Sequence, residues 1–557
     1  MTETLPALSS EDGCAAARPV SQRAVAAAEV ERGTASHQRG AFAEAGQHYT
    51  NALNALGVSC DGTADIGGVL KKLPEDEVLS DALHYYGALR VQQLQKATAC
   101  KDDDEDESSM GGRDVPAVND RSLSPEELAD LQQSLFLLRS AATALPQGAA
   151  STKRGRILNT IGAACLMLTS SGLEDALDAL RQSVRFVPDL WAPRANLVRA
   201  LRRKGKDASP NEEAELEMEA ASTLAEMARI RPTHPGIFYR FGMSLKAAGR
   251  TAEAIDALER HLEAAEEAVA SSRETGAGEC RAFASWKTAQ TRHWLAVMRG
   301  DNTATAPPEY VASLFDFYAE KFEEHLVCKL QYNTPTLLAE ELRRVLPPAA
   351  SEWRRCADLG CGTGLMGPPL RRLGFKGRLE GVDLSEGMLL QARKKGGRGV
   401  GYDRLLCGDI LDVFVPLPEE GQLPSEQGVG EEGAVSVEHA TRDETRLALE
   451  PPEGSRFELV VAADVFVYIG DLGPVFKTVA RWLAVGGIFA FSTETSESDV
   501  SGAYQLTDTG RYTHDLHYVR HLGEEEGLSL CGSRGVVLRM NGGKPVNGHV
   551  HILRRAG

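Results

Sequence analysis

The sequence predicts two parts: an all-α array of helical repeats, followed by an α/β domain built on a parallel sheet that ends in an antiparallel hairpin. Glycine and alanine recur at the spacing of helix contacts along residues 23–300, which supports the first part. Apolar, strand-like runs that each end in an aspartate recur within residues 301–557, which supports the second. Because α/β sheets bind ligands at the carboxyl ends of their strands, chemistry is expected in the second part.

Composition narrows the class of protein. The chain has 557 residues, of which 42% are hydrophobic and 25% charged, as in globular proteins. Its formal net charge of −18 argues against broad binding to nucleic-acid phosphates, so no nucleic-acid partner is expected. No run of about 18 apolar residues is present, and no membrane span is expected.

The cysteines and the N-terminal residues indicate the cellular compartment in which the protein is expected. None of the ten cysteines forms a C-x-x-C pair, so neither a zinc ribbon nor a thioredoxin-type site is predicted. The first 25 residues lack the apolar core of a secretory signal, and residues 1–22 are expected to be disordered. We therefore expect a cytoplasmic protein that keeps its thiols reduced.

The N-terminal half repeats one helix-turn-helix pattern. Within residues 32–53, glycines at 33 and 40 precede aromatic and alanine positions, and residues 235–261 repeat the arrangement. Two further second helices keep apolar and small residues at one spacing, namely Ala176, Leu180 and Ser183, then Ala220, Leu224 and Met227. These segments resemble tetratricopeptide (TPR) units, of which four are expected. An irregular helical domain with coincidental spacing is the alternative.

The resemblance to TPR proteins implies a surface that binds a protein partner, since stacked helical pairs present a concave face. Residues 101–123 interrupt the array with a run of aspartate, glutamate and serine. We interpret this run as a solvated, disordered insertion, because no Ca²⁺-loop spacing accompanies its carboxylates. No metal site is predicted anywhere in the chain.

A glycine-rich turn dominates the C-terminal half. An apolar run reaches Asp358, passes Gly360, Gly362 and Gly364, and meets two prolines that can open a helix. Glycines let backbone amides approach a ligand closely, and a helix N-terminus favours an anionic group. The turn fits both a dinucleotide fingerprint, G-x-G-x-x-G, and the pattern Asp-Leu-Gly-x-Gly-x-Gly.

Further strand-like runs end in Asp383, Asp409 and Asp464. The first two intervals, 358 to 383 and 383 to 409, are 25 and 26 residues, the length of a strand, a helix and two loops. The third interval becomes similar once residues 416–455, a low-complexity insertion, are removed. Four carboxylates are thus predicted at one edge of a parallel sheet. The alternative is that each aspartate only caps the following helix.

These motifs resemble those of class I S-adenosylmethionine (SAM)-dependent methyltransferases, which have a Rossmann-like fold. The segments 310–335, 462–472, 486–492 and 510–514 resemble more narrowly a group of predicted methyltransferases that carry TPR repeats. After a strand at 488–492, two strands at 528–540 and 548–554 are expected to form the antiparallel end of the sheet. That hairpin is the reason to prefer SAM over a dinucleotide.

The resemblance assigns cofactor-binding roles. Gly360, Gly362 and Gly364 would wrap the methionine moiety of SAM, with Asp358 beneath the turn. Asp383 would accept both ribose hydroxyls. Asp409 would meet the adenine amino group, and Ile410 would lie against the ring.

Other residues are candidates for the lid and for catalysis. Tyr318 lies in a helix before the first motif that often closes over the cofactor, although packing over the sheet is an equally simple role. Asp464 and the segment to Tyr468 would line the methyl-transfer face. His514 is a candidate general base where the nucleophile carries a proton, and a structural role is its alternative.

The function expected from the resemblance is SAM-dependent methyl transfer to an unidentified acceptor, with the TPR-like repeats recruiting a protein substrate or partner. Neither an Asn/Asp-Pro-Pro-Tyr motif after the fourth strand nor a Pro-Cys pair is present, which disfavours base amino and cytosine C5 methylation. Three alternatives stay open: a small-molecule methyltransferase with repeats used for assembly, a non-enzymatic scaffold with a SAM-binding domain, and a dinucleotide oxidoreductase.

Overall fold

The computed structural model describes residues 20–58, 75–98, 123–168, 170–232, 234–275, 279–323, 331–346, 353–395, 401–414, 437–439, 455–495, 502–541 and 543–557. Two compact units divide the chain: residues 1–110 with 117–254, and residues 111–116 with 255–557. The predicted boundary at 300/301 differs from this division and stays a prediction. Most of the disorder expected at 1–22 and 101–123 falls outside the described residues.

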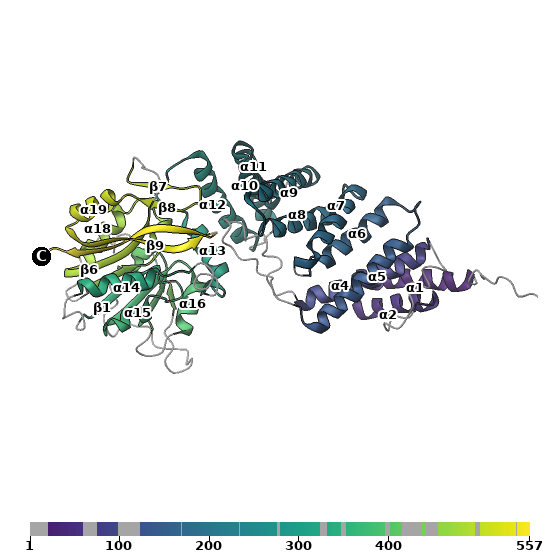
Figure 1. Cartoon of the computed structure of the whole chain (residues 1–557), viewed down its shortest axis with the longest axis horizontal. Helices are drawn as coiled ribbons and strands as arrows, with labels where there is room; N and C mark the ends of the chain where they lie inside the picture. Colours follow the sequence, from purple (N-terminus) through teal and green to yellow (C-terminus); the bar gives the residue numbers. More distant parts are fainter. Residues whose placement is uncertain are drawn as a thin grey trace, which may run out of the picture. The chain divides into compact units, whose positions relative to one another are not determined.

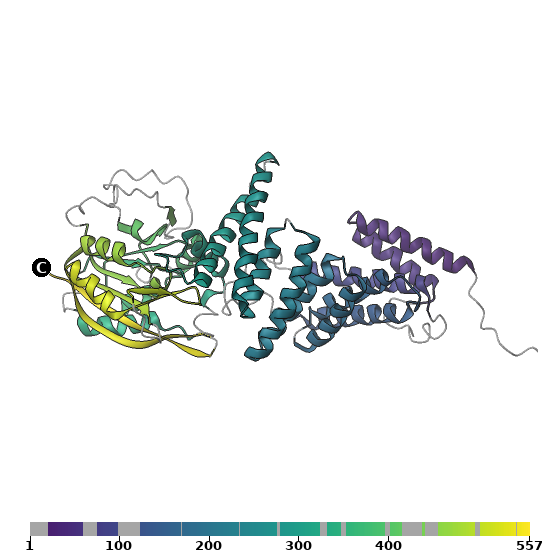
Figure 2. The same cartoon turned by 90° about the horizontal axis from the view of Figure 1, so that it is seen from above.

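The N-terminal unit is helical (Figures 1 and 2). Its helices pack as consecutive pairs, α1 on α2, α4 on α5, α6 on α7 and α8 on α9. Their bounds are α1 Val20–Gln38, α2 Phe42–Ala55, α4 Glu77–Thr98, α5 Pro125–Ala144, α6 Ser151–Cys165, α7 Leu173–Phe186, α8 Trp191–Gly205, α9 Pro210–Ile230 and α10 Pro235–Ala247.

Glycine explains how closely two of these pairs approach. A Cβ added to Gly33 of α1 would lie 2.5 Å from the ring of Tyr49 in α2. One added to Gly162 of α6 would lie 2.4 Å from Leu180 in α7. Only a hydrogen atom fits at these positions, so the glycines set the helix separation. The predicted contact residues of the second helices are buried, namely Ala176, Leu180, Ser183, Ala220, Leu224 and Met227.

The C-terminal unit contains a mixed sheet with the strand order β4-β3-β2-β1-β5-β6-β10-β9. Strands β1 to β6 pair in parallel, β10 is antiparallel to β6, and β9 is antiparallel to β10. The small strands β7 and β8 pair with each other beside the end of β6. Their bounds are β1 Arg355–Leu359, β2 Arg378–Asp383, β3 Arg404–Cys407, β4 Val437–His439, β5 Phe457–Ala462, β6 Leu483–Glu494, β7 Tyr504–Leu506, β8 Tyr512–His514, β9 Leu528–Asn541 and β10 Lys544–Arg555.

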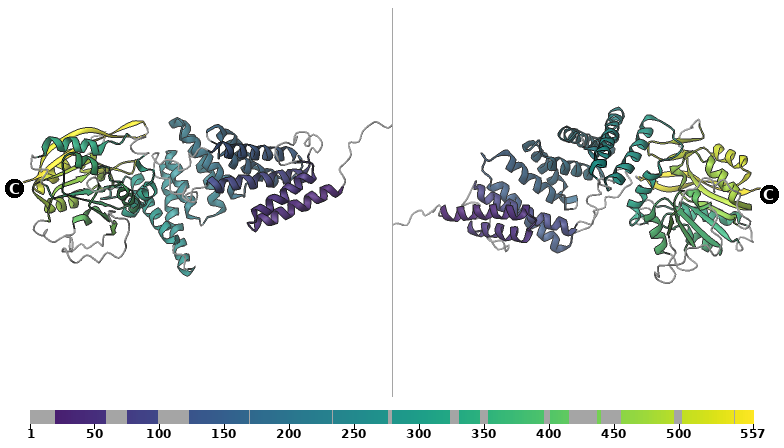
Figure 3. Two further views of the ribbon diagram at one scale, coloured as in Figure 1. Left: turned by 90° about the horizontal axis from the view of Figure 1, so that it is seen from below. Right: turned by 180° about the vertical axis from the view of Figure 1, so that it is seen from behind.

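Helices cover both faces of the sheet (Figures 1 and 3). Alternate residues of each central strand face opposite cores: Cys356 and Leu459 join α14, α15 and α16, whereas Ala357 and Val460 join α18 and α19. The bounds are α11 Thr251–Thr275, α12 Glu279–Arg299, α13 Pro308–Tyr318, α14 Thr334–Val345, α15 Gly367–Arg372, α16 Glu386–Lys394, α18 Gly473–Trp482 and α19 Leu516–Glu525.

Three short strands were not expected from the sequence. Strand β4 lies inside the stretch 416–455 that was interpreted as a low-complexity insertion, most of which is outside the described residues. It pairs with β3 through its backbone, and three residues carry too little pattern to predict. Strands β7 and β8 are equally short, and they place residue 511 at the end of the sheet where the parallel strands finish.

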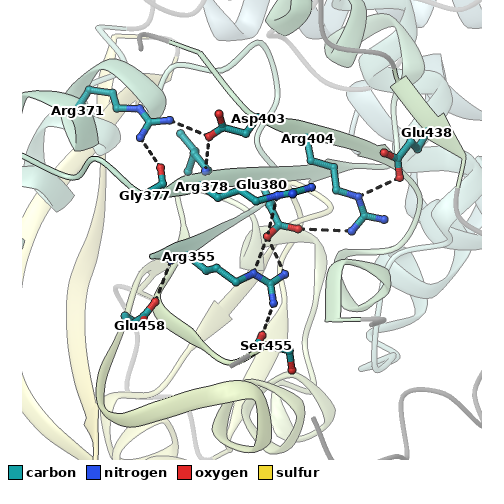
Figure 4. Close-up of polar contacts among 11 residues, drawn as sticks. Arg355, Arg371, Gly377, Arg378, Glu380, Asp403, Arg404, Glu438, Ser455 and Glu458 are labelled. Atoms are coloured by element: carbon teal, nitrogen blue, oxygen red, sulfur yellow. Dashed lines mark hydrogen bonds and ion pairs between the residues drawn. The ribbon is translucent and has the colours of Figure 1, made fainter. Parts of the chain in front are cut away.

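The amino ends of the parallel strands are joined by an ion network (Figure 4). The side chain of Glu380 on β2 is fully buried and pairs with Arg355 on β1, Arg404 on β3 and Arg378 on its own strand. Arg404 also reaches Glu438 of β4, with a distance of 3.0 Å between Nε and Oε2. Because this network lies at the amino ends of the strands, it holds the sheet from the edge opposite the carboxyl ends.

In the part of the chain that the structure describes, we find no helix with both the length and the apolar composition that crossing a membrane requires.

Candidate active site

A pocket opens at the carboxyl ends of the parallel strands. It encloses about 1230 Å³, part of which is open to solvent. Its lining is mainly apolar with a few charged groups, as in most small-molecule sites. Among its described lining residues are Val311, Phe315, Phe322, Tyr332, Asp358, Gly360, Gly362, Asp383, Asp409, Ile410, Asp464, Val467, Tyr468, Ile469, Arg511 and Arg539.

The structure brings the four strand-end carboxylates to this one pocket. Asp358 is the penultimate residue of β1 and Asp383 the last residue of β2. Asp409 and Asp464 follow β3 and β5 by two residues. Because these four strands are neighbours and parallel, their carboxyl ends share one edge of the sheet. The regular intervals between these aspartates in the sequence therefore correspond to one pocket that all four carboxylates line.

The glycine turn has the backbone that its composition implies. Gly360, Gly362 and Gly364 have φ angles of 64°, 53° and 84°, in the left-handed region that favours glycine. A Cβ at Gly360 would lie 2.6 Å from Val465, whereas nothing lies within 4 Å of a Cβ at Gly362. Gly362 therefore faces open space in the pocket. Gly364 packs on Tyr402 and is not among the lining residues.

Asp383 connects the turn to the following helix. Its Oδ2 accepts a hydrogen bond from the amide of Gly362 at 2.9 Å, and its Oδ1 accepts one from the amide of Ser385 at 2.9 Å. Each carboxylate oxygen keeps a further acceptor site, since a carboxylate offers about four lone pairs. Burial raises the pKa of Asp383 to about 6, although these backbone hydrogen bonds oppose the shift. It is mostly ionised at pH 7 and can accept two more donors.

Asp358 lies beneath the turn and is buried. Its Oδ2 accepts a hydrogen bond from the hydroxyl of Tyr402. Burial raises the pKa of Asp358 to about 7, and the hydrogen bond from Tyr402 partly offsets the effect. The ionised form is therefore disfavoured by folding: the stability that protonated Asp358 contributes is lost as the pH rises through about 7.

Replacing Asp358 by asparagine, which resembles the protonated form, is expected to stabilise the protein increasingly with pH. The free-energy advantage of the variant over the wild type should grow by about 2–3 kcal/mol between pH 5 and pH 8. Thermal unfolding of both proteins without ligand measures it. Asp301→Asn, at an exposed aspartate outside the pocket, is the matched control. A difference in unfolding free energy between Asp358→Asn and the wild type that does not change with pH would contradict the burial cost.

Asp409 serves two purposes. Its Oδ1 accepts a hydrogen bond from the amide of Leu411 at 3.0 Å, which starts the short 3-10 helix η4 (Ile410–Phe414). The local capping alternative is thus realised, yet Asp409 also lines the pocket together with Ile410. A carboxylate next to an apolar side chain suits a flat heterocycle with an exocyclic amine.

Asp464 is held by an arginine that the sequence does not place near it. Nη1 of Arg539, on β9, donates to Oδ1 and Oδ2 of Asp464 at 2.8 and 2.7 Å. The other amino group, Nη2, contacts Glu494 at the end of β6. Asp464 has a φ of 60°, unusual for a residue with a Cβ, and the two bonds from Arg539 hold it there. Its carboxylate is committed to an ion pair facing the pocket.

The helix predicted to cover the site is α13, and its contact residue differs from the predicted one. Phe315 and Phe322 line the pocket, whereas Tyr318, which the sequence singled out, is not among the described lining residues. The ring of Phe315 stands edge-on to Tyr468 with centroids 5.5 Å apart. Spacing along the helix does not tell which of its aromatic residues reaches inward.

A carboxylate fastens α13 to the sheet domain. Oδ1 of Asp316 accepts a hydrogen bond from the Ser385 hydroxyl at 2.6 Å and one from the Gly387 amide at 3.0 Å. Both donors belong to the start of α16, directly after Asp383. The covering helix and the Asp383 loop are therefore one connected structure.

Tyr468 and His514 differ in placement. Tyr468 ends the 3-10 helix η5 (Phe466–Tyr468) and lines the pocket. His514 is buried outside the described lining, and its Nε2 donates to the carbonyls of Ile469 and Gly470 at 2.9 and 3.1 Å. Burial lowers its pKa to about 4, so the ring is neutral at pH 7. In this arrangement His514 positions the backbone after Tyr468.

Several lining residues escaped the sequence-based assignment. Arg539 comes from β9, and Tyr332 comes from the segment before α14. The hydroxyl of Tyr332 donates to the carbonyl of Ala463 at 3.4 Å. The only signal for Tyr332 was its place in the segment 310–335 that resembles the repeat-bearing group. Arg511 precedes β8, and its only signal was its place in the segment 510–514 that resembles the same group. Among the described residues, no cluster of histidine, cysteine, aspartate and glutamate suits a metal ion.

Comparison with known proteins agrees with this geometry. Residues 330–553 match the family model described as "Methyltransferase domain", which is less than half of the chain. A curated relative, malonyl-[acyl-carrier protein] O-methyltransferase of Legionella pneumophila, is 37% identical over 185 residues. The match covers 33% of this chain and 49% of the relative, so the chain spans about half the length of the curated relative.

Solved methyltransferase structures are also similar to this chain. A SAM-dependent methyltransferase from Mesorhizobium loti is 20% identical, with 39% of this chain and 98% of that chain covered and a TM-score of 0.26. The 1,6-didemethyltoxoflavin-N1-methyltransferase of Burkholderia thailandensis is 17% identical, with 46% and 93% covered and a TM-score of 0.29. Likenesses at these TM-scores do not bear on what this chain acts on.

The segment 330–553 matches a methyltransferase domain. SAM is the cofactor that the sequence motifs imply. The pocket fits this group in three respects. Gly362 leaves open space where a side chain would block a ligand. Asp383 keeps acceptor capacity for two hydroxyl groups, and Asp409 with Ile410 offers a polar and an apolar edge for an aminated ring.

Proposed function

We propose that this protein is a SAM-dependent methyltransferase whose helical N-terminal part is a TPR-like array that recruits a protein substrate or partner. The observation that carries the proposal is the lining of one pocket by the glycine turn and the carboxylates at 358, 383, 409 and 464. In this proposal Asp383 holds the ribose hydroxyls, Asp409 and Ile410 the adenine, and the turn from Gly360 to Gly364 the methionine moiety.

When bound, SAM supplies a methyl group activated on a sulfonium. The residues of this chain then bind, orient and exclude water. Phe315 and Phe322 of the covering segment close the pocket with apolar surface, and Asp316 ties that segment to the start of α16. Asp464 and Tyr468 line the face where we place the acceptor, with Asp464 oriented by Arg539. The O-methyltransferase activity in the curated relative's name supports an oxygen atom as the acceptor.

The recruiting role is supported by the paired helices and by a groove in the N-terminal unit. This groove is lined by residues of α2, α4 and α5, namely Phe42, Ala43, Gly46, Gln47, Thr50, Tyr86, Leu89, Arg90, Gln93 and Gln133. Aromatic and amide side chains in one groove suit an extended peptide, which needs both apolar contact and hydrogen bonds.

Labelled SAM incubated with the full-length protein and a cell extract tests the proposal. Label is expected in protein, and the double variant Gln47→Lys and Gln93→Lys should reduce it several-fold without changing the affinity for S-adenosylhomocysteine (SAH). Gln132→Lys on α5, an exposed residue that does not line the groove, is the matched control.

The outcomes separate the rival functions. Label that enters only small molecules, unaffected by the groove variants, would indicate a small-molecule methyltransferase whose repeats serve assembly. Binding of SAH without any labelled product would indicate a scaffold that senses the cofactor.

A further inference from the structure

Arg511 stands apart from the other cation of the pocket. Of the described residues that line the pocket, two are cationic, Arg511 and Arg539. Arg539 is 2% exposed and donates to both oxygens of Asp464 and to Glu494. No carboxylate of the described residues lies within 4.0 Å of the Arg511 guanidinium. Asp464 and Glu494 are already paired with Arg539, whereas Arg511 has no ion pair within the described part of the chain.

The backbone holds Arg511 in place, although its side chain has no carboxylate partner among the residues with described positions. Its carbonyl accepts hydrogen bonds from the amide and the hydroxyl of Thr507, both at 2.9 Å, which closes the turn between β7 and β8. Burial and the neighbouring charge of Arg539 on β9 disfavour the charged form of Arg511, whereas Glu494 and Asp464, at the ends of β6 and β5, favour it. The carboxylates assigned to ribose and adenine, Asp383 and Asp409, are on the other side of β1.

Charge balance points to what Arg511 binds. A guanidinium keeps its proton at any physiological pH and is unfavourable in a half-buried site without an anion. On the β5–β6 side of the pocket both acids, Asp464 and Glu494, are bonded to Arg539. Asp383 and Asp409 add negative charge to the rest of the lining, so an anion is expected only next to Arg511, where no described carboxylate lies within 4.0 Å. An anion bound there would pair with Arg511. The apolar lining from Val311, Phe315, Val467 and Ile469 strengthens such an ion pair.

We propose that the methyl acceptor is a carboxylic acid and that Arg511 binds its carboxylate. The proposal rests on the proposed methyltransferase function and specifies its substrate class. The planar fork of one guanidinium matches a carboxylate with two parallel hydrogen bonds. A phosphate dianion is a poorer match, because its second charge would require Arg539, which is committed to Asp464 and Glu494. The carboxylate can belong to a small acid or to a protein, and the labelling experiment above separates these sources.

The test uses the full-length protein saturated with SAH and a pair of matched probes. Hexanoate has a carboxylate on an apolar stem, and hexanamide is its neutral counterpart. Hexanoate is expected to raise the unfolding temperature of the SAH complex, as any ligand of the folded state does, and hexanamide is not. Arg511→Gln should abolish the hexanoate effect, Arg511→Lys should retain part of it, and Arg520→Gln, an exposed site on α19, should leave it intact.

Three results would overturn the inference. One is that hexanoate raises the unfolding temperature of Arg511→Gln as much as that of the wild type. If the glutamine variant does not fold, the same result for Arg511→Lys takes its place. Another is protection by inorganic phosphate that exceeds protection by hexanoate and depends on Arg511. The third is a loss of SAH affinity of about 10-fold or more in Arg511→Gln, which would place the cofactor's own carboxylate on this residue. If the wild type fails to bind SAH, the proposed function itself fails, whereas SAH binding with any of these results removes only the carboxylate assignment.

Discussion

Replacing Asp383 by alanine is expected to weaken the binding of SAM and SAH by at least about 100-fold. Two hydrogen bonds to a carboxylate contribute about 1.5 kcal/mol or more each, which corresponds to this factor. The same substitution removes the acceptors for the amides of Gly362 and Ser385, so the glycine turn and the start of α16 lose their common anchor. Isothermal calorimetry with SAH on the full-length protein measures the effect.

The control for this prediction is Asp301→Ala, an exposed aspartate outside the pocket, which should bind SAH as the wild type does. The pH dependence gives a second readout. Since the pKa of Asp383 is about 6, SAH affinity of the wild type is expected to fall as the pH drops below 6. An Asp383→Ala variant that folds and binds SAH within a few-fold of the wild type would contradict the assignment of the ribose site.

Replacing Glu380 by alanine is expected to destabilise the C-terminal unit by about 3–5 kcal/mol, the usual cost of breaking a buried ion pair. The side chain of Glu380 is fully buried, and those of Arg355 and Arg404 are only 13% and 10% exposed. Without Glu380, two nearly buried guanidinium groups lose their shared anion (Figure 4). Thermal unfolding of the full-length protein should show the transition of this unit shifted downward.

A control variant and a binding measurement show whether the Glu380 network affects stability alone or also the pocket. Glu438→Ala removes a partner of Arg404 that is 46% exposed on β4, and this change should cost less than about 1 kcal/mol. Folded Glu380→Ala protein should bind SAH with nearly wild-type affinity below its unfolding temperature, because the network lies at the opposite ends of the strands. Equal destabilisation by Glu380→Ala and Glu438→Ala would show that the burial of Glu380 does not determine how much its ion pairs stabilise the unit.

The sequence was most informative where chemistry is tied to strand periodicity. Asp358, Asp383, Asp409 and Asp464 each follow an apolar run at similar intervals, and parallel strands bring the ends of such runs to one edge. The glycines at 33 and 162 were likewise interpretable, because only glycine permits the observed approach of Tyr49 and Leu180. In both cases a local rule and the tertiary arrangement point the same way.

Contacts between distant segments could not be predicted in this way. The pairing of Arg539 with Asp464 joins positions 75 residues apart, and no periodicity relates β9 to the loop after β5. Packing decides that Phe315 rather than Tyr318 of α13 lines the pocket, and spacing along the helix does not show this. A histidine near a strand end suggested a base, yet burial and two backbone carbonyls give His514 a positioning role.

The two ends of the sheet thus have separate tasks. At the amino ends, one buried glutamate pairs with three arginines and joins neighbouring strands. At the carboxyl ends, four aspartates line an open pocket, two of them with pKa values raised to about 7 and about 6 by burial. Carboxylates that are costly to bury are retained in a site when a ligand pairs with them.

A crystal structure of the full-length protein with SAH most directly tests whether these carboxylates surround one adenosyl group. We predict the ribose on Asp383, the adenine between Asp409 and Ile410, and the amino-acid moiety along the turn from Gly360 to Gly364. Electron density for SAH elsewhere, or a dinucleotide pyrophosphate seated on that turn, would contradict the account.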